Sequence, residues 1–400
     1  MQRQHVSLYI KLFFSVTLIS IIMGGLASFF LNSLTLVNDI RLRHSWLLYL
    51  LPIGGMITRY CYLKYDKMAA EGVNLVLKRA RGHQNRIPIG MLPLALFGTL
   101  LTHLLGGSAG REGTSVQMGG AVAEAITTRF GLDRDKKYQR LLMMTGIAAG
   151  FSATFGTPLA GTFFAYEAPR YRHLPKIQPL LIIYASFLSN MIGELVGATH
   201  RLYPVVNLDH ISLKNLLSLV ILGILAGAVA FLFTFSLTLL KKVYHDLIGK
   251  PILISAIGAV IFIFIITLFK LEDYQGLSLQ LFDRAFSEQS SGWDFLKKLM
   301  TTVLTLAAGF QGGEVTPLFE IGASLGNVLV HQGLTLSITT AAACGFIAVF
   351  ASAANIPITG FIMGIELFGW GILPYLFIVI PISYLISTSR TIYTSQLKPL

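Results

Sequence analysis

The chain has 400 residues, of which 54% are hydrophobic and 12% are charged, and its mean hydropathy is +0.67. Soluble domains carry about 25% charged residues, so this composition excludes an ordinary soluble protein. The formal net charge of +12 is spread over expected loops, such as Arg79 to Arg86 and Lys241–Lys242. Basic residues in such loops set membrane topology and bind anionic lipid, so the charge does not indicate nucleic-acid binding.

Apolar runs recur along the whole chain and predict an all-α, polytopic membrane protein. They occupy residues 12–31, 46–57, 177–192, 216–240, 252–269, 299–310 and 375–386. Several approach the ~20 residues that span a bilayer, and the shorter ones resemble broken helices. Arg3 and Lys11 precede the first run, which favours a first membrane helix with its N-terminus inside over a signal peptide. We expect one membrane domain over residues 1–400, without a soluble regulatory domain.

A glycine-rich break, GSAGREGTSVQMGG at residues 107–120, follows the apolar run 87–105 and leads into a helix-forming stretch. It places Arg111 and Glu112 at membrane depth, where an ionisable residue is a functional hypothesis by default. Unpaired N–H groups at a helix start also favour anions. The break therefore predicts an anion site with a protonatable acid. The alternative is a carboxylate that only caps its helix.

Motifs for other chemistries are weak. Gly106 to Gly110 matches the G-x-S-x-G pattern of serine hydrolases through Ser108, but it follows a helix-like run and not a strand, so we expect no enzyme. The histidines are scattered without H-E-x-x-H or C-x-x-C spacing, so we expect neither a metal site nor a cofactor. Cys61 and Cys344 lie in apolar segments, which is typical of core cysteines.

An internal similarity relates two halves of the chain, about 200 positions apart. The pattern P-x2-G-x5-E occurs at Pro158 and again at Pro357, ending at Glu167 and Glu366. The pattern G-x-E-x-T occurs at 110–114 and at 312–316, which makes Glu314 the counterpart of Glu112. A looser pair joins residues 71–74 to 275–278. We therefore expect two repeats, about 40–200 and 212–400, with a substrate site near the midplane between their helix ends.

Three segments carry a family resemblance: G-R-E-G at 110–113, A-A-G-F-S-A-T-F-G-T-P-L-A-G at 148–161 and G-G-E-V-T-P at 312–317. They resemble the CLC family of chloride channels and anion/proton antiporters, and closely its fluoride/proton antiporter branch. The resemblance implies two inverted, intertwined helical repeats, with broken helices meeting at a midplane anion site. It also implies a homodimer in which each subunit holds its own pathway.

The resemblance also assigns roles. Glu112 falls on the gating glutamate that competes with the anion and carries the proton, and Tyr393 falls on a tyrosine near the central site. Val73 replaces a serine of chloride-selective members, Thr114 replaces a proline, and Val315 stands at a usual phenylalanine. These substitutions favour fluoride over chloride. The expected anion-binding set is Val73, Asn74, Gly110, Arg111, Gly113, Thr114, Gly313, Glu314, Val315, Thr316 and Tyr393.

The function that the resemblance implies is export of cytoplasmic fluoride against inward proton flow, in a bacterial inner membrane. Ala168 stands where many chloride/proton antiporters have a second glutamate after the one at Glu167, so protons must reach Glu112 by another route. The alternatives are a chloride/proton antiporter or chloride channel of the same family, an intramembrane hydrolase, and a scaffold that transports nothing.

Overall fold

The computed structural model describes residues 2–83, 85–170, 178–208, 212–287, 290–387 and 390–396. Within these ranges the chain forms α-helices joined by short 3-10 turns, with no strand, which confirms the all-α prediction. The first eight helices are α1 Gln2–Arg43, α2 Leu51–Tyr65, α3 Val73–Ala80, α4 Met91–Leu104, α5 Glu112–Arg129, α6 Lys136–Phe155, α7 Pro158–Glu167 and α8 Gln178–Leu195. The next eight are α9 Leu213–Ile248, α10 Pro251–Phe269, α11 Leu279–Ala285, α12 Asp294–Ala307, α13 Val315–His331, α14 Ile338–Ala354, α15 Pro357–Phe368 and α16 Leu373–Ser387.

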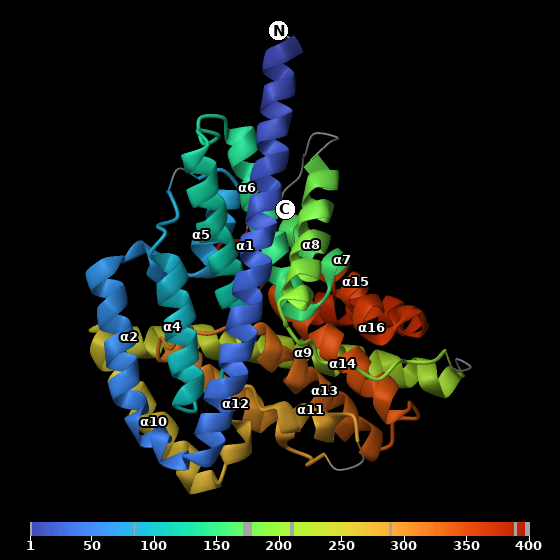
Figure 1. Ribbon diagram of the computed structural model, residues 1–400. Helices are drawn as coiled ribbons and strands as arrows, with labels where there is room; N and C mark the ends of the chain where they lie inside the picture. Colours follow the sequence, from blue (N-terminus) through green and yellow to red (C-terminus); the bar gives the residue numbers. More distant parts are fainter. Residues whose placement is uncertain are drawn as a thin grey trace.

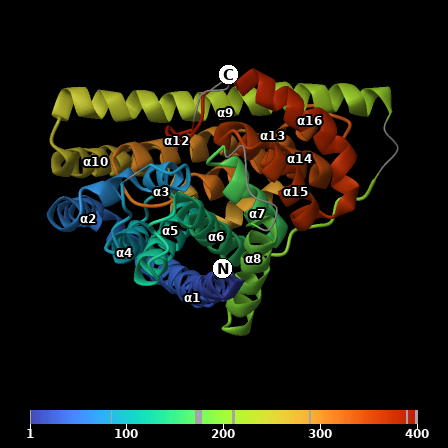
Figure 2. The same ribbon diagram turned by 90° about the horizontal axis from the view of Figure 1, so that it is seen from above.

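Helix length varies as the apolar runs predict. Four helical stretches of the described chain are long and apolar enough to cross a membrane, at Leu8–Arg43, Leu213–Ile248, Pro251–Phe269 and Trp370–Ser387. Many others are shorter. Figure 1 shows α1 upright, with α9 crossing the molecule at a steep angle to it, and Figure 2 shows the two helices on opposite sides.

Local signals explain where several helices begin and end. Proline occupies the first turn of α2, α7, α10 and α15, where its missing N–H costs nothing. The side chains of Asp135, Ser212 and Ser337 accept hydrogen bonds from the backbone at the starts of α6, α9 and α14. The ends of α6 and α14 carry residues in the left-handed conformation, Gly156 and Asn355.

The two halves repeat the same order of helices, so that α1 to α8 correspond to α9 to α16. In the first half, α5 packs on α6 with Gly119 against the backbone of Gly146. In the second half, α13 packs on α14 with Gly322 against the backbone of Gly345. We infer that the first repeat extends back to α1 rather than beginning near residue 40.

The halves contact each other at several places in the described structure. Helix α2 packs on α10, α7 packs on α15, and the segments that precede α5 and α13 meet in an isolated antiparallel bridge between Gly110 and Gly313. The bridge shows that the G-x-E-x-T alignment was wrong by one residue. Because α5 begins at Glu112 and α13 begins at Val315, the counterpart of Glu112 is Val315 rather than Glu314.

Two sets of basic residues were wrongly placed in loops. Arg79 lies in α3 with its side chain buried, and it forms a two-point ion pair with Glu124 of α5, with N–O distances of 2.9 and 2.7 Å. Lys241 and Lys242 lie in the last turns of α9, which continues beyond the apolar run to Ile248. Burial with an acidic partner is the usual condition for an arginine inside a membrane protein.

Candidate anion site

The two glycine breaks meet at the centre of the chain's tertiary structure. The N–H of Gly110 donates to the carbonyl of Gly313 over 2.7 Å, and the N–H of Gly313 donates back over 2.8 Å. Helix α5 begins two residues after Gly110, and α13 begins two residues after Gly313. The bridge therefore brings two positively polarised helix starts together, as the sequence predicts for an anion site.

The carboxylate of Glu112 fills the space between these helix starts. Its Oε2 accepts a hydrogen bond from the N–H of Arg111 over 3.1 Å, and its Oε1 accepts one from the hydroxyl of Thr316. The side chain is only 1% exposed. A Cβ atom added at Gly110 or at Gly313 would lie 2.5 Å from Oε2 and would also meet less mobile atoms, Pro317 Cδ or the backbone N of Gly113, at 2.9 Å, so glycine suits both positions.

This arrangement places a negative group where a small anion would bind. The carboxylate takes its hydrogen bonds from one helix start and from the first turn of the other, which are the donors an anion would use. The carboxylate and an anion therefore compete for one position.

Of residues 73, 74 and 393, Val73 contacts the glycine break, whereas Asn74 and Tyr393 contact neighbouring segments. The side chain of Val73, the first residue of α3, lies 3.4 Å from where a Cβ of Gly113 would be. The Oδ1 of Asn74 accepts a hydrogen bond from the N–H of Ser395 over 2.9 Å, which ties α3 to the C-terminal segment. Tyr393 is 5% exposed and packs edge-on against Phe164 of α7.

The remaining predicted residues do not all point at Glu112. The hydroxyl of Thr114 lies 2.5 Å from that of Thr99 in α4, so its side chain is directed away from the bridge, unlike that of Thr316. Arg111 is partly buried, and its Nε has no hydrogen-bond partner among the described residues. Glu314 is partly buried just before α13, close enough to Lys241 of α9 for their charges to interact.

The geometry does not support a serine hydrolase. The hydroxyl of Ser108 lies 3.0 Å from that of Thr302, and the ring Nε2 of His103 lies 3.4 Å from the carbonyl of Gly110. Ser108 and His103 are thus engaged with different partners. Among the described residues no group of three or more histidine, cysteine, aspartate or glutamate side chains could hold a metal ion.

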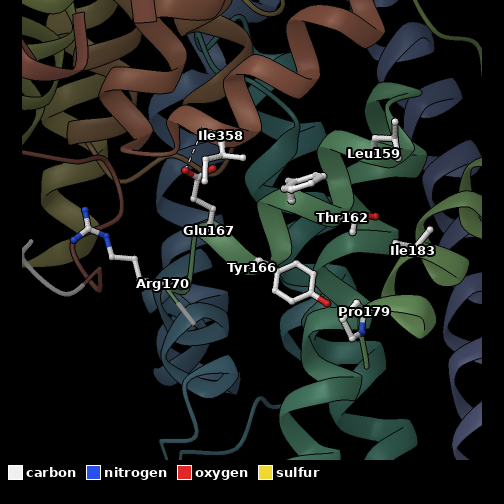
Figure 3. A pocket seen from close by; sticks show the side chains of 9 residues that line it. Leu159, Thr162, Tyr166, Glu167, Arg170, Pro179, Ile183 and Ile358 are labelled. Carbon is white, nitrogen blue, oxygen red and sulfur yellow. Dashed lines mark hydrogen bonds between the residues drawn. The ribbon is translucent and has the colours of Figure 1, made fainter. Parts of the chain in front are cut away.

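Glu167 and Glu366 hold α7 and α15 together by reciprocal caps. Glu167, at the end of α7, accepts hydrogen bonds from the first N–H groups of α15, at Ile358 and Thr359, over 2.9 and 2.7 Å. Glu366, near the end of α15, accepts the N–H groups of Leu159 and Ala160 at the start of α7. Figure 3 shows Glu167 reaching toward Ile358. Both carboxylates therefore have a structural role, in which each one caps the helix of the other repeat.

One charged pair near the site was not anticipated. Lys298 of α12 and Glu320 of α13 form an ion pair of 3.0 Å, and both side chains are fully buried. The available signal was the position of Glu320 inside an otherwise apolar helix, four residues after Thr316.

Comparison with known proteins decides the family. The family model described as voltage gated chloride channel matches residues 54–388. The chain belongs to this family. A chloride/fluoride channel protein of Pseudomonas syringae pv. tomato is 35% identical over 385 residues, covering 95% of this chain and 84% of the relative. An H(+)/Cl(-) exchange transporter, ClcA of Vibrio vulnificus, is 25% identical over 395 residues, covering 91% of this chain and 83% of the relative.

Solved structures of the voltage gated chloride channel family share the fold. The crystal structure of a CLC-type fluoride/proton antiporter superposes with a TM-score of 0.90 at 34% identity, covering 96% of this chain and 97% of that one. A slow cyanobacterial Cl-/H+ antiporter gives a TM-score of 0.80 at 21% identity, over 94% of each chain, and so supports the fold alone. The predicted CLC fold is confirmed, and the chain is an integral membrane protein of a transporter and channel family.

Proposed function

We propose that the protein exports fluoride from the cytoplasm in exchange for protons, with Glu112 as both gate and proton carrier. The observation that carries this proposal is the position of the Glu112 carboxylate between two helix starts, held by Arg111 N–H and the Thr316 hydroxyl. Relatives described as a chloride/fluoride channel protein and as a fluoride/proton antiporter support the choice of ions. Transport, not catalysis, is the activity that this site serves.

The exchange follows from competition for one position. When Glu112 is charged, its carboxylate occupies the position between the helix starts and excludes the anion. When Glu112 is protonated, it loses the charge that holds it there, and fluoride takes over the N–H and hydroxyl donors. Fluoride is strongly hydrated, so hydroxyl groups such as that of Thr316 must replace part of its water shell. The apolar side chain of Val73 lines this path where a hydroxyl of serine would favour chloride.

A chloride/proton antiporter is the second candidate, because relatives about 25% identical to this chain are H(+)/Cl(-) exchange transporters. The test is efflux from liposomes that hold the purified protein and are loaded with either anion. We expect fluoride to leave at least tenfold faster than chloride. Equal rates for the two anions would exclude the fluoride assignment in favour of the chloride one.

We also propose that the protein works as a homodimer in a bacterial plasma membrane, with the contact at the apolar hollow between α7, α8 and α15. Leu159 and Ile358 are 41% and 54% exposed on this face, and each comes from a different repeat (Figure 3). A face built from both repeats suits a two-fold contact. Ile358→Trp is expected to give monomers in detergent, whereas Ile53→Trp, at a 50% exposed position of α2, is expected to leave the dimer intact.

A further inference from the structure

The Lys298–Glu320 pair has an unusual set of partners. The ammonium of Lys298 donates to the hydroxyl of Ser278 over 2.8 Å and to the carbonyl of Gly276 over 3.2 Å, besides its ion pair with Oε2 of Glu320. Within the described part of the chain, Oε1 of Glu320 accepts no hydrogen bond. A buried acceptor without a donor lowers stability, so an ion pair kept only for stability would be expected to have all its acceptors hydrogen-bonded.

One end of the pair reaches a polar pocket. Ser278, which holds the ammonium, also lines a hollow of about 700 Å³ together with Asn38, Arg41, Glu272 and Asp273. Its lining residues Asn38 and Arg41 belong to the last turns of α1. This end of α1 lies at the bottom of Figure 1. If the N-terminus faces the cytoplasm, this pocket opens on the outer side, from which the proposed exchange draws its protons.

The other end of the pair approaches the gate. Glu320 follows Thr316 by four residues on α13, so the two side chains share a helix face with their Cβ atoms roughly 5–6 Å apart. The hydroxyl of Thr316 donates to the carboxylate of Glu112. A rotation of the Glu320 side chain therefore brings its carboxyl group toward the gate.

Other charged or titratable groups lie near the Lys298–Glu320 pair without bonding to it. The positive charge of Arg41 in α1 lies close enough to repel that of Lys298, and the positive charge of Arg201 lies close enough to attract the Glu320 carboxylate. The ring of Tyr203 lies among the same charges. Within the described structure, none of these three side chains forms a hydrogen bond with Lys298 or Glu320.

The equivalent place in the first repeat is not ionisable. Gly119 of α5 and Gly322 of α13 make the same close contact in their halves, and this register matches Glu320 with Gln117. The side-chain amide of Gln117 lies beside Gly72 in the first repeat. In the second repeat, the ammonium of Lys298, which pairs with Glu320, lies beside Gly276. An amide does not accept and release a proton near neutral pH, so the position equivalent to Glu320 in the first repeat cannot relay protons.

We propose that Lys298 and Glu320 relay protons between this pocket and Glu112. Lys298 passes a proton to Glu320, which leaves a neutral amine and a carboxylic acid. The acid gives its proton to the Glu112 carboxylate, and the amine takes up another from water in the pocket through the hydroxyl of Ser278. One proton has then moved from the pocket to Glu112, and both members of the pair are charged again.

The relay rests on the proposed antiport, and two variants test it in liposomes with an outward fluoride gradient. Lys298→Arg keeps a positive charge beside Glu320, but a guanidinium does not release its proton. The double variant Lys298→Met/Glu320→Leu removes the pair without leaving a lone buried charge. The matched control is Arg79→Met/Glu124→Leu, which removes another buried ion pair, between α3 and α5.

We expect proton uptake to fall at least tenfold in both relay variants, and to stay within twofold of wild type in the control. Binding of fluoride to the purified variants, measured by calorimetry, identifies those that are folded. Proton uptake within twofold of wild type in any folded relay variant overturns the relay, as does an equal loss in a folded control. Absence of proton uptake in the wild type would instead contradict the proposed antiport.

Discussion

Replacing Thr316 with valine tests how the gate carboxylate is held. The hydroxyl of Thr316 donates to Oε1 of Glu112, and the substitution removes this donor while nearly preserving the shape of the side chain. A hydrogen bond to a charged group contributes about 1.5–3 kcal/mol. Because 1.36 kcal/mol corresponds to one pH unit, the loss should shift protonation of the gate by about 1–2 pH units.

The direction of the shift follows from which form the bond favours. The Thr316 hydroxyl stabilises the charged carboxylate, so without it Glu112 takes up its proton at higher pH. We therefore expect the pH of half-maximal proton uptake to rise by about 1–2 units in Thr316→Val. The assay is fluoride-driven proton uptake into liposomes at saturating fluoride, followed across a range of external pH.

The matched control is Thr114→Val. Thr114 occupies the first turn of α5 as Thr316 occupies that of α13, but its hydroxyl pairs with that of Thr99. We expect the pH midpoint of this variant to stay within about 0.3 units of wild type. An unchanged midpoint in Thr316→Val, or an equal shift in Thr114→Val, would refute the reasoning.

Three further substitutions test the site and the supporting structure. Gly313→Ala places a methyl group 2.5 Å from the gate carboxylate, so we expect at least tenfold lower proton uptake per fluoride transported. In the control Gly25→Ala the added methyl group meets nothing within 4 Å, and this variant should transport normally. Glu366→Ala deprives two N–H groups at the start of α7 of their acceptor, and it should lower the free energy of unfolding in detergent by about 1–3 kcal/mol. Arg79→Met leaves a buried carboxylate unpaired and should lower the free energy of unfolding by about 3–5 kcal/mol in a denaturant titration. Lys78→Ala breaks an exposed ion pair and should lower the same free energy by less than about 1 kcal/mol. Similar losses for Lys78→Ala and Arg79→Met would contradict the burial argument.

The sequence predicted the elements of the fold whose signals are local. Pro158 and Pro357, which the repeated pattern has in common, begin α7 and α15, because proline suits the first turn of a helix. The meeting of the two glycine breaks followed from the repeat. The exact alignment of the two repeats was not predicted. The sequence comparison aligned the two glutamates, Glu112 and Glu314, whereas α5 begins at Glu112 and α13 begins one residue after Glu314.

Side-chain direction was the part that sequence could not supply. Thr114 and Thr316 match in the letter pattern, but Thr114 is the third residue of α5 and Thr316 is the second residue of α13. Their side chains therefore leave the two helices in different directions, and only the hydroxyl of Thr316 reaches Glu112, whereas that of Thr114 lies beside Thr99 of α4. The partnership of Lys298 with Glu320 likewise depends on the packing of α12 against α13, which no local pattern encodes.

The central claim is that one carboxylate is both gate and proton carrier, and the most direct test compares wild type with Glu112→Gln. Fluoride efflux and proton uptake are recorded together on the same liposomes, with a fluoride electrode and a pH electrode. Glutamine has nearly the same size as glutamate, but it has neither the charge that holds the carboxylate between the helix starts nor a proton to exchange. We therefore predict that fluoride efflux continues and proton uptake disappears. Proton uptake that stays coupled to fluoride efflux in Glu112→Gln would contradict the account.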